Sequence, residues 1–376
     1  MSRPPDKRFR VLQVIQNLNY GGMERLLADI VRQADPARFE SHVLALGYLG
    51  RFSEGLEQYA SLHLSPALPF YSLLWPSPLI RTIQAIAPDV VHMHSGVWYK
   101  VSLAARHARV PKLIFTEHGR PAIDRWLPRM LDRAAARRTD VVVAVSETVA
   151  ARLRQGIVTP RSRMVVVENG VDVQVYRPRP DNGKIRGELG ISPQTPIIGS
   201  VGRLEHIKGY DVMIQAYALL LQRWTAGTPP ALVVGGDGAE RDRCLTAAKA
   251  HHLESVFLLG WRDDIHDMHA AFQLFTMSSR SEGTSVSLLE AMSAGLCPVV
   301  TDVGGNAAVL GEHLRHRLVA TENPSALADA WMAALMKPEK CAADGANARR
   351  RVEDSFSLGR MVKRYEDLYA EPAQRG

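Results

Sequence analysis

The sequence predicts an α/β protein made of two doubly wound, Rossmann-like domains, each built on a parallel sheet. The chain has 376 residues, which is too long for one ordinary core and suits two domains. Short and nearly continuous apolar runs alternate with longer helical patterns, as parallel strands buried on both faces require. This alternation stops at residues 176–183, a polar segment rich in proline and glycine, and then starts again.

The apolar runs give the predicted strands in order. In the first half they lie at residues 9–15, 41–46, 89–94, 112–116 and 140–145. Helical patterns between them cover residues 23–33, 98–107 and 128–138. In the second half the strands lie at residues 196–201, 231–234, 256–259, 274–277 and 297–301. Helices follow them from near Gly209, Ala239, Ile265, Ser285 and Asn306, and residues 358–369 form a last amphipathic helix. We therefore place the domains at residues 1–178 and 179–357.

The composition is that of a soluble globular protein, with 46% apolar and 23% charged residues. No apolar stretch approaches the roughly 20 residues of a membrane span, and we expect no signal peptide. The three cysteines are widely spaced, which argues against a disulfide framework or a zinc cluster. These features predict a cytoplasmic protein.

The charge is unevenly divided along the chain. Residues 1–180 hold 25 Lys and Arg against 15 Asp and Glu, whereas residues 181–376 hold 21 against 24. A basic first half suggests an anionic partner, and a solvated arginine-rich surface explains the composition equally well. No nucleic-acid-binding motif accompanies the charge, so we expect no nucleic acid partner.

Two cations follow the first strand of the second domain. Arg203 and Lys208 lie five positions apart, between the strand and a helix that begins near Gly209. Ligands of doubly wound folds bind at the carboxyl ends of the strands. Arg203 as a fork and Lys208 as a point charge can hold a diphosphate there, although two solvated charges give the same pattern.

Two carboxylates converge on the same edge. Glu282 follows the strand at 274–277, and Glu290 lies in the next helix among apolar neighbours that predict its burial. Between them, Gly283, Thr284 and Ser285 open the helix, whose first N–H groups form an anion site. A carboxylate beside a sugar accepts hydrogen bonds from paired hydroxyls. The simpler alternatives are a favourable charge at a helix start for Glu282 and a surface position for Glu290.

Glycine turns end two further strands of this domain. Gly235 lies in a Gly-Gly-Asp-Gly turn that allows close backbone approach to a ligand. The turn that holds Arg262 is similar and can contact a base through its backbone. Neither half has a Gly-x-Gly-x-x-Gly after its first strand, so no dinucleotide cofactor is indicated.

The first domain contributes weaker signals. Gly21 and Gly22 open a helix after the first strand, which suits an anion or an ordinary turn. His118 follows the fourth strand beside a glycine and suits a substrate contact. His92 and His94 share one strand face, but no third ligand has metal-binding spacing, so packing or an acceptor contact is favoured over a metal.

Taken together, these residues resemble the GT-B-fold retaining glycosyltransferases of family 4, over about residues 11–369. The motifs that carry the resemblance are Gly21-Gly22, His118-Gly119, Asn169-Gly-Val-Asp172, Gly202-Arg203…Lys208-Gly209 and Glu282…Glu290. Relatives often have an aromatic residue and then glycine after the Glu-Gly pair, where this chain has Thr284 and Ser285. This departure bears on the sugar preference and not on the reaction class.

The resemblance implies a fold, a reaction and roles. The two domains would face each other across a cleft, with the C-terminal helix, residues 358–376, crossing back onto the first domain. Arg203 and Lys208 would bind the diphosphate of a UDP- or GDP-sugar, with Gly22 donating a backbone N–H. Glu282 would hold the transferred sugar and Glu290 the ribose. His118 would lie near the sugar and the acceptor, and no metal or other cofactor is expected.

The acceptor side is less defined. A glycan or lipid-linked acceptor, in bacterial polysaccharide, lipopolysaccharide or glycolipid assembly, follows from the usual work of the family. Arginines cluster over residues 120–138 near Trp126 and Leu127, which suggests peripheral contact with anionic lipid on the inner face of the cytoplasmic membrane. The alternatives are a nucleotide-sugar epimerase on the same fold and a non-catalytic sugar-nucleotide-binding protein; a phosphorylase would need a longer chain and a cofactor lysine.

Overall fold

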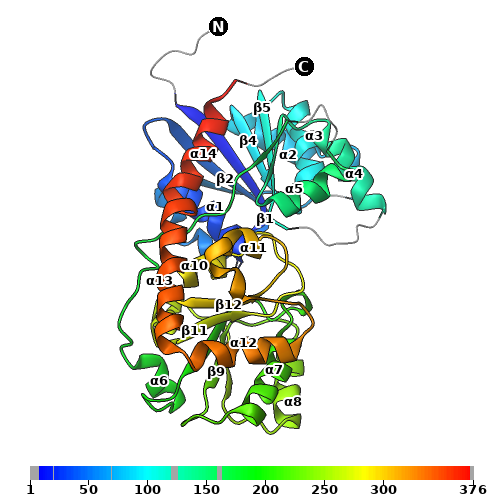
Figure 1. The fold of residues 1–376 in the computed structure, drawn as a ribbon. Coiled ribbons are helices and arrows are strands. Elements are labelled where there is room, and N and C mark those ends of the chain that lie inside the picture. The colour runs from blue at the N-terminus through cyan, green and yellow to red at the C-terminus, as the bar shows by residue number, and fades with distance from the viewer. Residues whose placement is uncertain (1–7, 20, 69, 120–125, 159–162, 373–376) are drawn as a thin grey trace. The chain divides into compact units, whose positions relative to one another are not determined.

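The computed structural model describes residues 8–19, 21–68, 70–119, 126–158 and 163–372. The chain divides into two compact units, and Figure 1 shows their elements. Unit 1 comprises residues 1–169 and 358–376, and unit 2 comprises residues 170–357. This division lies before the predicted boundary at 178, because Val171 N–H donates to Phe356 O and Tyr176 is buried in the unit 2 core.

Unit 1 has a seven-stranded parallel sheet with the strand order β3-β2-β1-β4-β5-β6-β7. Its strands are β1 (Phe9–Asn17), β2 (Phe39–Tyr48), β3 (Ser61–Leu64), β4 (Val90–His94), β5 (Lys112–Glu117), β6 (Val141–Ala144) and β7 (Arg163–Val166). Its helices are α1 (Gly22–Gln33), α2 (Ser77–Ile86), α3 (Trp98–His107), α4 (Trp126–Ala136), α5 (Glu147–Arg154) and α14 (Leu358–Ala370). The two outer strands, β3 and β7, are not among the strands predicted from the sequence.

The unit 1 sheet is covered on both faces, which is why its strands are almost wholly apolar. Apolar residues of α2, α3 and α5 pack on one face. On the other face, α1 packs beside β1 and β2, and α14 contacts both α1 and β1. The last helix of the chain therefore completes the layer that covers the first sheet (Figure 1).

Unit 2 has a six-stranded parallel sheet with the order β10-β9-β8-β11-β12-β13. Its strands are β8 (Ile197–Val201), β9 (Ala231–Gly235), β10 (Val256–Leu258), β11 (Leu274–Met277), β12 (Cys297–Thr301) and β13 (Leu318–Val319). Its helices are α6 (Lys184–Leu189), α7 (Tyr210–Arg223), α8 (Arg241–Ala250), α9 (Ile265–Ala271), α10 (Val286–Ser293), α11 (Asn306–Leu310), α12 (Pro324–Leu335) and α13 (Pro338–Ser355).

Two apolar clusters cover the faces of this second sheet. Residues of α9, α10, α11 and α13 pack on one face, and residues of α7, α8 and α12 pack on the other. All strand pairs in both sheets are parallel, so the carboxyl ends of neighbouring strands meet at one edge of each sheet. The two doubly wound α/β sheets predicted from the sequence are present.

Candidate functional site

The centre of the candidate site in unit 2 is an ion pair between two loops. Lys208 ends a short 3-10 turn between β8 and α7, and Glu282 lies between β11 and α10. Lys208 Nζ lies 2.7 Å from Glu282 Oε1, and the two side chains are 21% and 7% exposed. The Ser279 hydroxyl donates to the same carboxylate oxygen at 2.6 Å. Two residues 74 positions apart in sequence are thus brought together at the carboxyl edge of the sheet.

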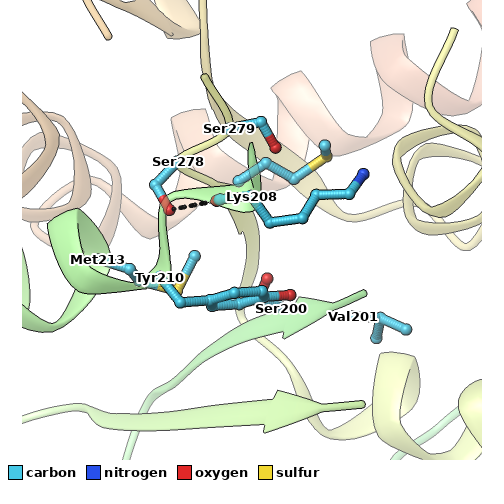
Figure 2. Close-up of a pocket in the computed structure, with 8 residues that line it drawn as sticks. Ser200, Val201, Lys208, Tyr210, Met213, Ser278 and Ser279 are labelled. Carbon is cyan, nitrogen blue, oxygen red and sulfur yellow. Dashed lines mark hydrogen bonds between the residues drawn. The ribbon is translucent and has the colours of Figure 1, made fainter. Parts of the chain in front are cut away.

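The backbone around Lys208 is held from β11. The Ser278 hydroxyl donates to the carbonyl oxygen of Gly209, at 2.8 Å, and lies 3.2 Å from that of Lys208. Gly209 has φ +65°, and a Cβ there would lie 2.2 Å from Ser278 O, so only glycine fits. Figure 2 shows the Lys208 side chain extended above the Tyr210 ring, beside a small pocket that Ser200, Met277 and Ser279 also line. The ammonium is therefore held in place by both loops.

Arg280 is a second clamp on this loop and was not among the predicted site residues. Its guanidinium makes two hydrogen bonds of 2.9 Å to Asp211 and one of 2.6 Å to the His206 carbonyl oxygen. Its backbone N–H donates to Ile207 O at 2.8 Å. The Asp211 carboxylate, together with that of Glu322, which also contacts the guanidinium, raises the pKa of Arg280 well above its usual range. Arg280 thereby fixes the turn that positions Lys208.

The start of α10 follows Glu282 directly. Ser285 caps the helix, because its hydroxyl accepts the Leu288 N–H at 3.4 Å. Thr284, Ser285 and Glu290 are all buried, so Glu290 lies inside unit 2 as its apolar neighbours predicted.

The Gly304-Gly305 turn after β12 packs against the loop that holds Glu282, and it was not among the predicted site residues. Gly305 N–H donates to Gly283 O at 2.8 Å. Gly304 has φ +60°, and a Cβ there would lie 1.9 Å from Glu282 O. The signal was present as Gly-Gly after the strand at 297–301, but only the fold shows that this turn contacts the Glu282 loop.

The turns after β8, β9 and β10 are joined by backbone hydrogen bonds. Gly202 N–H donates to Gly235 O at 2.9 Å, and Gly236 N–H donates to Gly260 O at 2.7 Å. A Cβ on Gly236 would lie 2.0 Å from Gly202 O, at a φ of +133°. The glycines of this edge therefore serve close packing between turns, in addition to any approach of a ligand to Gly235.

Two predicted donor-binding arginines have partners in the structure. Arg203 is half exposed and pairs with Glu205 at 2.8 Å. Arg262 contacts Glu188 and Asp264 through four hydrogen bonds of 2.7–2.9 Å, which raise its pKa above the usual range. The Arg262 side chain thus binds α6 and its own turn, whereas Arg203 needs only to leave an exposed ion pair to reach a ligand.

In unit 1, Gly21 and Gly22 form the start of α1. Gly21 precedes the helix in an extended conformation, its carbonyl accepts the Arg25 N–H at 3.1 Å, and Gly22 is exposed. The first turn contains Glu24, whose carboxylate lies within 2.1 Å of where a Gly21 Cβ would be. Gly22 is thus an exposed residue in the first turn of α1, and its contact with a donor stays a prediction.

His118 is the end of a buried hydrogen-bonded chain, which we call the histidine chain. Its links are His118 Nε2 to His94 Nδ1 (2.9 Å), His94 Nε2 to Gln13 Oε1 (3.0 Å), Gln13 Nε2 to Tyr369 Oη (2.9 Å), Tyr369 Oη to His92 Nδ1 (2.8 Å) and His92 Nε2 to Thr116 Oγ1 (2.7 Å). Burial lowers the pKa of His118 to about 4 and that of His92 to about 3. Burial and the neighbouring imidazoles hold the pKa of His94 well below 6.5.

The loop that carries His118 is fixed as well. The His118 N–H donates to the Ser95 hydroxyl at 2.9 Å, and that hydroxyl donates to Glu117 Oε1 at 2.7 Å. His92 and His94 are thus used in packing and hydrogen bonding, the interpretation favoured over metal binding. Among the residues that the structure describes, no group of three or more His, Cys, Asp or Glu could hold a metal ion. Every helix in the described ranges is too short or too polar to cross a membrane.

Family models match both units. The model for glycosyl transferases group 1 matches residues 181–351, and the model for glycosyltransferase family 4 matches residues 20–175. The chain is 30% identical over 310 residues to the lipopolysaccharide core biosynthesis mannosyltransferase LpcC of Rhizobium leguminosarum bv. viciae (79% of this chain, 80% of that one). It is 26% identical over 309 residues to N-acetyl-alpha-D-glucosaminyl L-malate synthase of Bacillus anthracis (80% and 79%).

A solved structure shows the same fold. Anabaena HepE in complex with UDP-glucose superimposes with a TM-score of 0.83 at 22% identity, over 97% of this chain and all of that one. The fold and the matched models define a GT-B glycosyltransferase. The chain belongs to the group 1 glycosyltransferases of the family 4 type, as its motifs predicted.

Proposed function

We propose that this glycosyltransferase moves a sugar from a UDP- or GDP-sugar to a glycan or lipid-linked acceptor and retains the anomeric configuration. The observation that carries the proposal is the Lys208–Glu282 pair, which places a cation and a carboxylate in contact at the carboxyl edge of unit 2. A diphosphate sugar needs both groups together: a cation for the phosphate and a carboxylate for the sugar hydroxyls.

The leaving group decides what the site must supply. Cleavage of a sugar–phosphate bond develops negative charge on the diphosphate and positive charge on the sugar. Lys208 and the capped N-terminus of α10 offer fixed positive charge, which stabilises that transition state without reorganisation. Arg203 adds a second cation once it leaves its exposed ion pair with Glu205. We propose that these groups act without a metal, so transfer is expected to persist in excess chelator.

The relatives support the substrate classes. HepE was solved with UDP-glucose, and LpcC is a mannosyltransferase of the lipopolysaccharide core. Both a UDP-sugar and a GDP-sugar are therefore to be tested as donors, with lipopolysaccharide-type glycans among the acceptors. A role in bacterial cell-surface glycan assembly is consistent with the name of LpcC. A cytoplasmic location stays a prediction.

Peripheral contact with an anionic membrane remains part of the proposal in a modified form. Arg120 and Arg125 of the predicted basic cluster lie outside the described residues. Arg129 donates to Gln155 O at 2.9 Å, and Arg133 donates to Gly156 O, so both guanidiniums are engaged by the end of α5. The exposed apolar side chains of α4, which are Trp126, Leu127 and Met130, are what a bilayer could contact. Flotation with anionic and with neutral liposomes tests this. Recovery with neither would remove the membrane contact, and equal recovery with both would remove its dependence on anionic lipid.

The function is tested first by ligand-induced stabilisation. A thermal-shift panel of UDP, GDP, ADP and their sugars identifies the donor, because a ligand that binds only the folded state raises the melting temperature. Transfer is then followed with that donor and candidate acceptors, with the anomeric configuration of the product read by NMR. Free sugar isomers without acceptor would indicate an epimerase, and binding without turnover across acceptors would indicate a binding protein.

A further inference from the structure

The histidine chain has a direction, and the amide of Gln13 sets it. An amide oxygen can only accept a hydrogen bond, and Gln13 Oε1 faces His94 Nε2 at 3.0 Å. His94 Nε2 therefore carries the proton of that ring. In a neutral imidazole the other nitrogen is then an acceptor, so His94 Nδ1 accepts the Nε2–H of His118 at 2.9 Å. It follows that His118 Nδ1 has a lone pair and no proton.

The remaining links agree with this direction. The Gln13 amide nitrogen donates to Tyr369 Oη, and the Tyr369 hydroxyl can then donate to His92 Nδ1. His92 Nε2–H in turn donates to the Thr116 hydroxyl oxygen. With all three imidazoles neutral, each link pairs one donor with one acceptor. Burial lowers the pKa of each of them, which keeps them neutral near pH 7.

The free end of the chain points to a ligand. His118 Nδ1 is buried, and no side chain or backbone group of the described residues forms a hydrogen bond with it. Buried polar atoms nearly always have a partner, and an acceptor left alone is destabilising. A substrate hydroxyl is a donor that matches a bare imidazole nitrogen, whereas a phosphate oxygen, which only accepts, does not.

We propose that Gln13, His94 and Tyr369 are positioning residues that hold His118 in the Nε2–H tautomer, so that His118 Nδ1 accepts a hydrogen bond from a hydroxyl of the bound substrate. This inference rests on the proposed function only in naming a hydroxylated substrate. It makes Tyr369, on the last helix, part of the apparatus that orients a side chain more than 250 positions earlier in the sequence.

The tautomer is read directly by NMR on the full-length protein with 15N-labelled histidine rings. The chemical shifts of the two ring nitrogens show which one carries the proton, and the spectrum of His118→Gln assigns the His118 signals. We expect His118 to be protonated on Nε2. A proton on His118 Nδ1 would mean that the chain runs in the opposite direction, and would overturn the proposal whether or not transfer is detected.

Two tyrosines of α14 provide a matched pair of variants. Tyr369→Phe removes the hydroxyl that orients the Gln13 amide. Tyr365→Phe removes a hydroxyl that lies 3.3 Å from Thr116 Oγ1, at the far end of the histidine chain, and keeps the ring that packs against His92. We expect mixed His118 tautomers and a roughly tenfold or larger loss of kcat at unchanged donor KM for Tyr369→Phe, as for other residues that orient a ligating group. Tyr365→Phe should keep the wild-type tautomer and kcat.

Other results separate the two proposals. Equal losses in both variants with unchanged tautomers would show a packing role and overturn the inference. If the wild type has the expected tautomer and Tyr369→Phe mixes it, the chain acts as inferred even where no sugar is transferred; only the proposed function then fails.

Discussion

The ion pair between Lys208 and Glu282 allows a structural role to be separated from a chemical one. Lys208→Met keeps the length of the side chain and removes the ammonium. Glu282, 7% exposed and now without its 2.7 Å ion pair, keeps the Ser279 hydroxyl bond. Loss of a charge-assisted hydrogen bond to a buried partner costs about 2 kcal/mol of folding free energy. Adding Glu282→Gln removes the carboxylate charge, so the double variant should lie within about 1 kcal/mol of the wild type.

Across the wild type, the single variant and the double variant, the rate of sugar transfer should not change in parallel with the free energy of unfolding. If Lys208 stabilises the leaving diphosphate, Lys208→Met lowers kcat/KM by about 100-fold or more, which is about 2.7 kcal/mol of transition-state stabilisation. The double variant restores the stability but not the cation, so its kcat/KM should remain at least as low. Urea unfolding followed by circular dichroism gives the stability, and initial rates with the donor found in the thermal-shift panel give the activity.

One result would refute this reasoning. If the double variant recovers transfer together with stability, Lys208 serves only to neutralise Glu282 and makes no contact with the leaving group that matters to the rate. Near-wild-type turnover of Lys208→Met alone would have the same meaning, and the assignment of the diphosphate site to this edge would be wrong.

Three further outcomes are expected. Arg280→Ala should lower kcat/KM about tenfold, because the turn before α7 loses the guanidinium that holds it. The control, Arg243→Ala, breaks an exposed ion pair in which 62% of the arginine side chain is in solvent, and should leave kcat/KM unchanged. Equal effects of the two variants on initial rates would argue against a positioning role for Arg280. Gly304 has φ +60°, and a Cβ there would lie 1.9 Å from Glu282 O, so Gly304→Ala should destabilise unit 2 by about 1–3 kcal/mol and weaken donor binding. Gly187 lies in α6 with open space where its Cβ would be, so Gly187→Ala should be neutral or stabilise the protein by up to about 1 kcal/mol. Calorimetry measures both changes in stability. Mild acid should destabilise unit 1, because burial lowers the pKa of His92 to about 3 and that of His118 to about 4, whereas both imidazoles bind protons near pH 6.5 in the unfolded chain. Their contribution to the free energy of unfolding is therefore complete above pH 6.5 and falls by about 1.4 kcal/mol per imidazole by pH 5.5. A urea midpoint that stays constant between pH 7 and 5.5 would contradict the last expectation.

Much of the fold could be predicted because a parallel strand that is buried on both faces has an almost wholly apolar sequence. The run at 297–301 became β12 with the same bounds, and the run at 274–277 became β11. The strands that were missed lie at sheet edges or are short: Arg163–Val166 begins with a charge, and Leu318–Val319 has only two residues. Their pairing comes from the neighbouring strand, which no local pattern records.

The candidate site was predictable where its chemistry lies in single side chains. Lys208 and Glu282 could be proposed because each follows a predicted strand, and the carboxyl ends of parallel strands meet at one edge of the sheet. The residues that hold these two side chains in place could not be predicted from the sequence. Arg280 contacts a backbone carbonyl, and Gly304 matters because it has no side chain. The partner that orients His118 through Gln13 comes from the far end of the chain, so no spacing rule finds it.

The return of α14 to unit 1 has a consequence for synthesis of the protein on the ribosome. Unit 2 is one continuous stretch, residues 170–357, and its whole sheet is available once that stretch has emerged. Unit 1 is interrupted, and His92 and Gln13 lack their Tyr369 partner until α14 has been translated. Unit 1 is therefore completed after unit 2, and a chain that stops between residues 357 and 369 has a complete second domain and an unfinished first one.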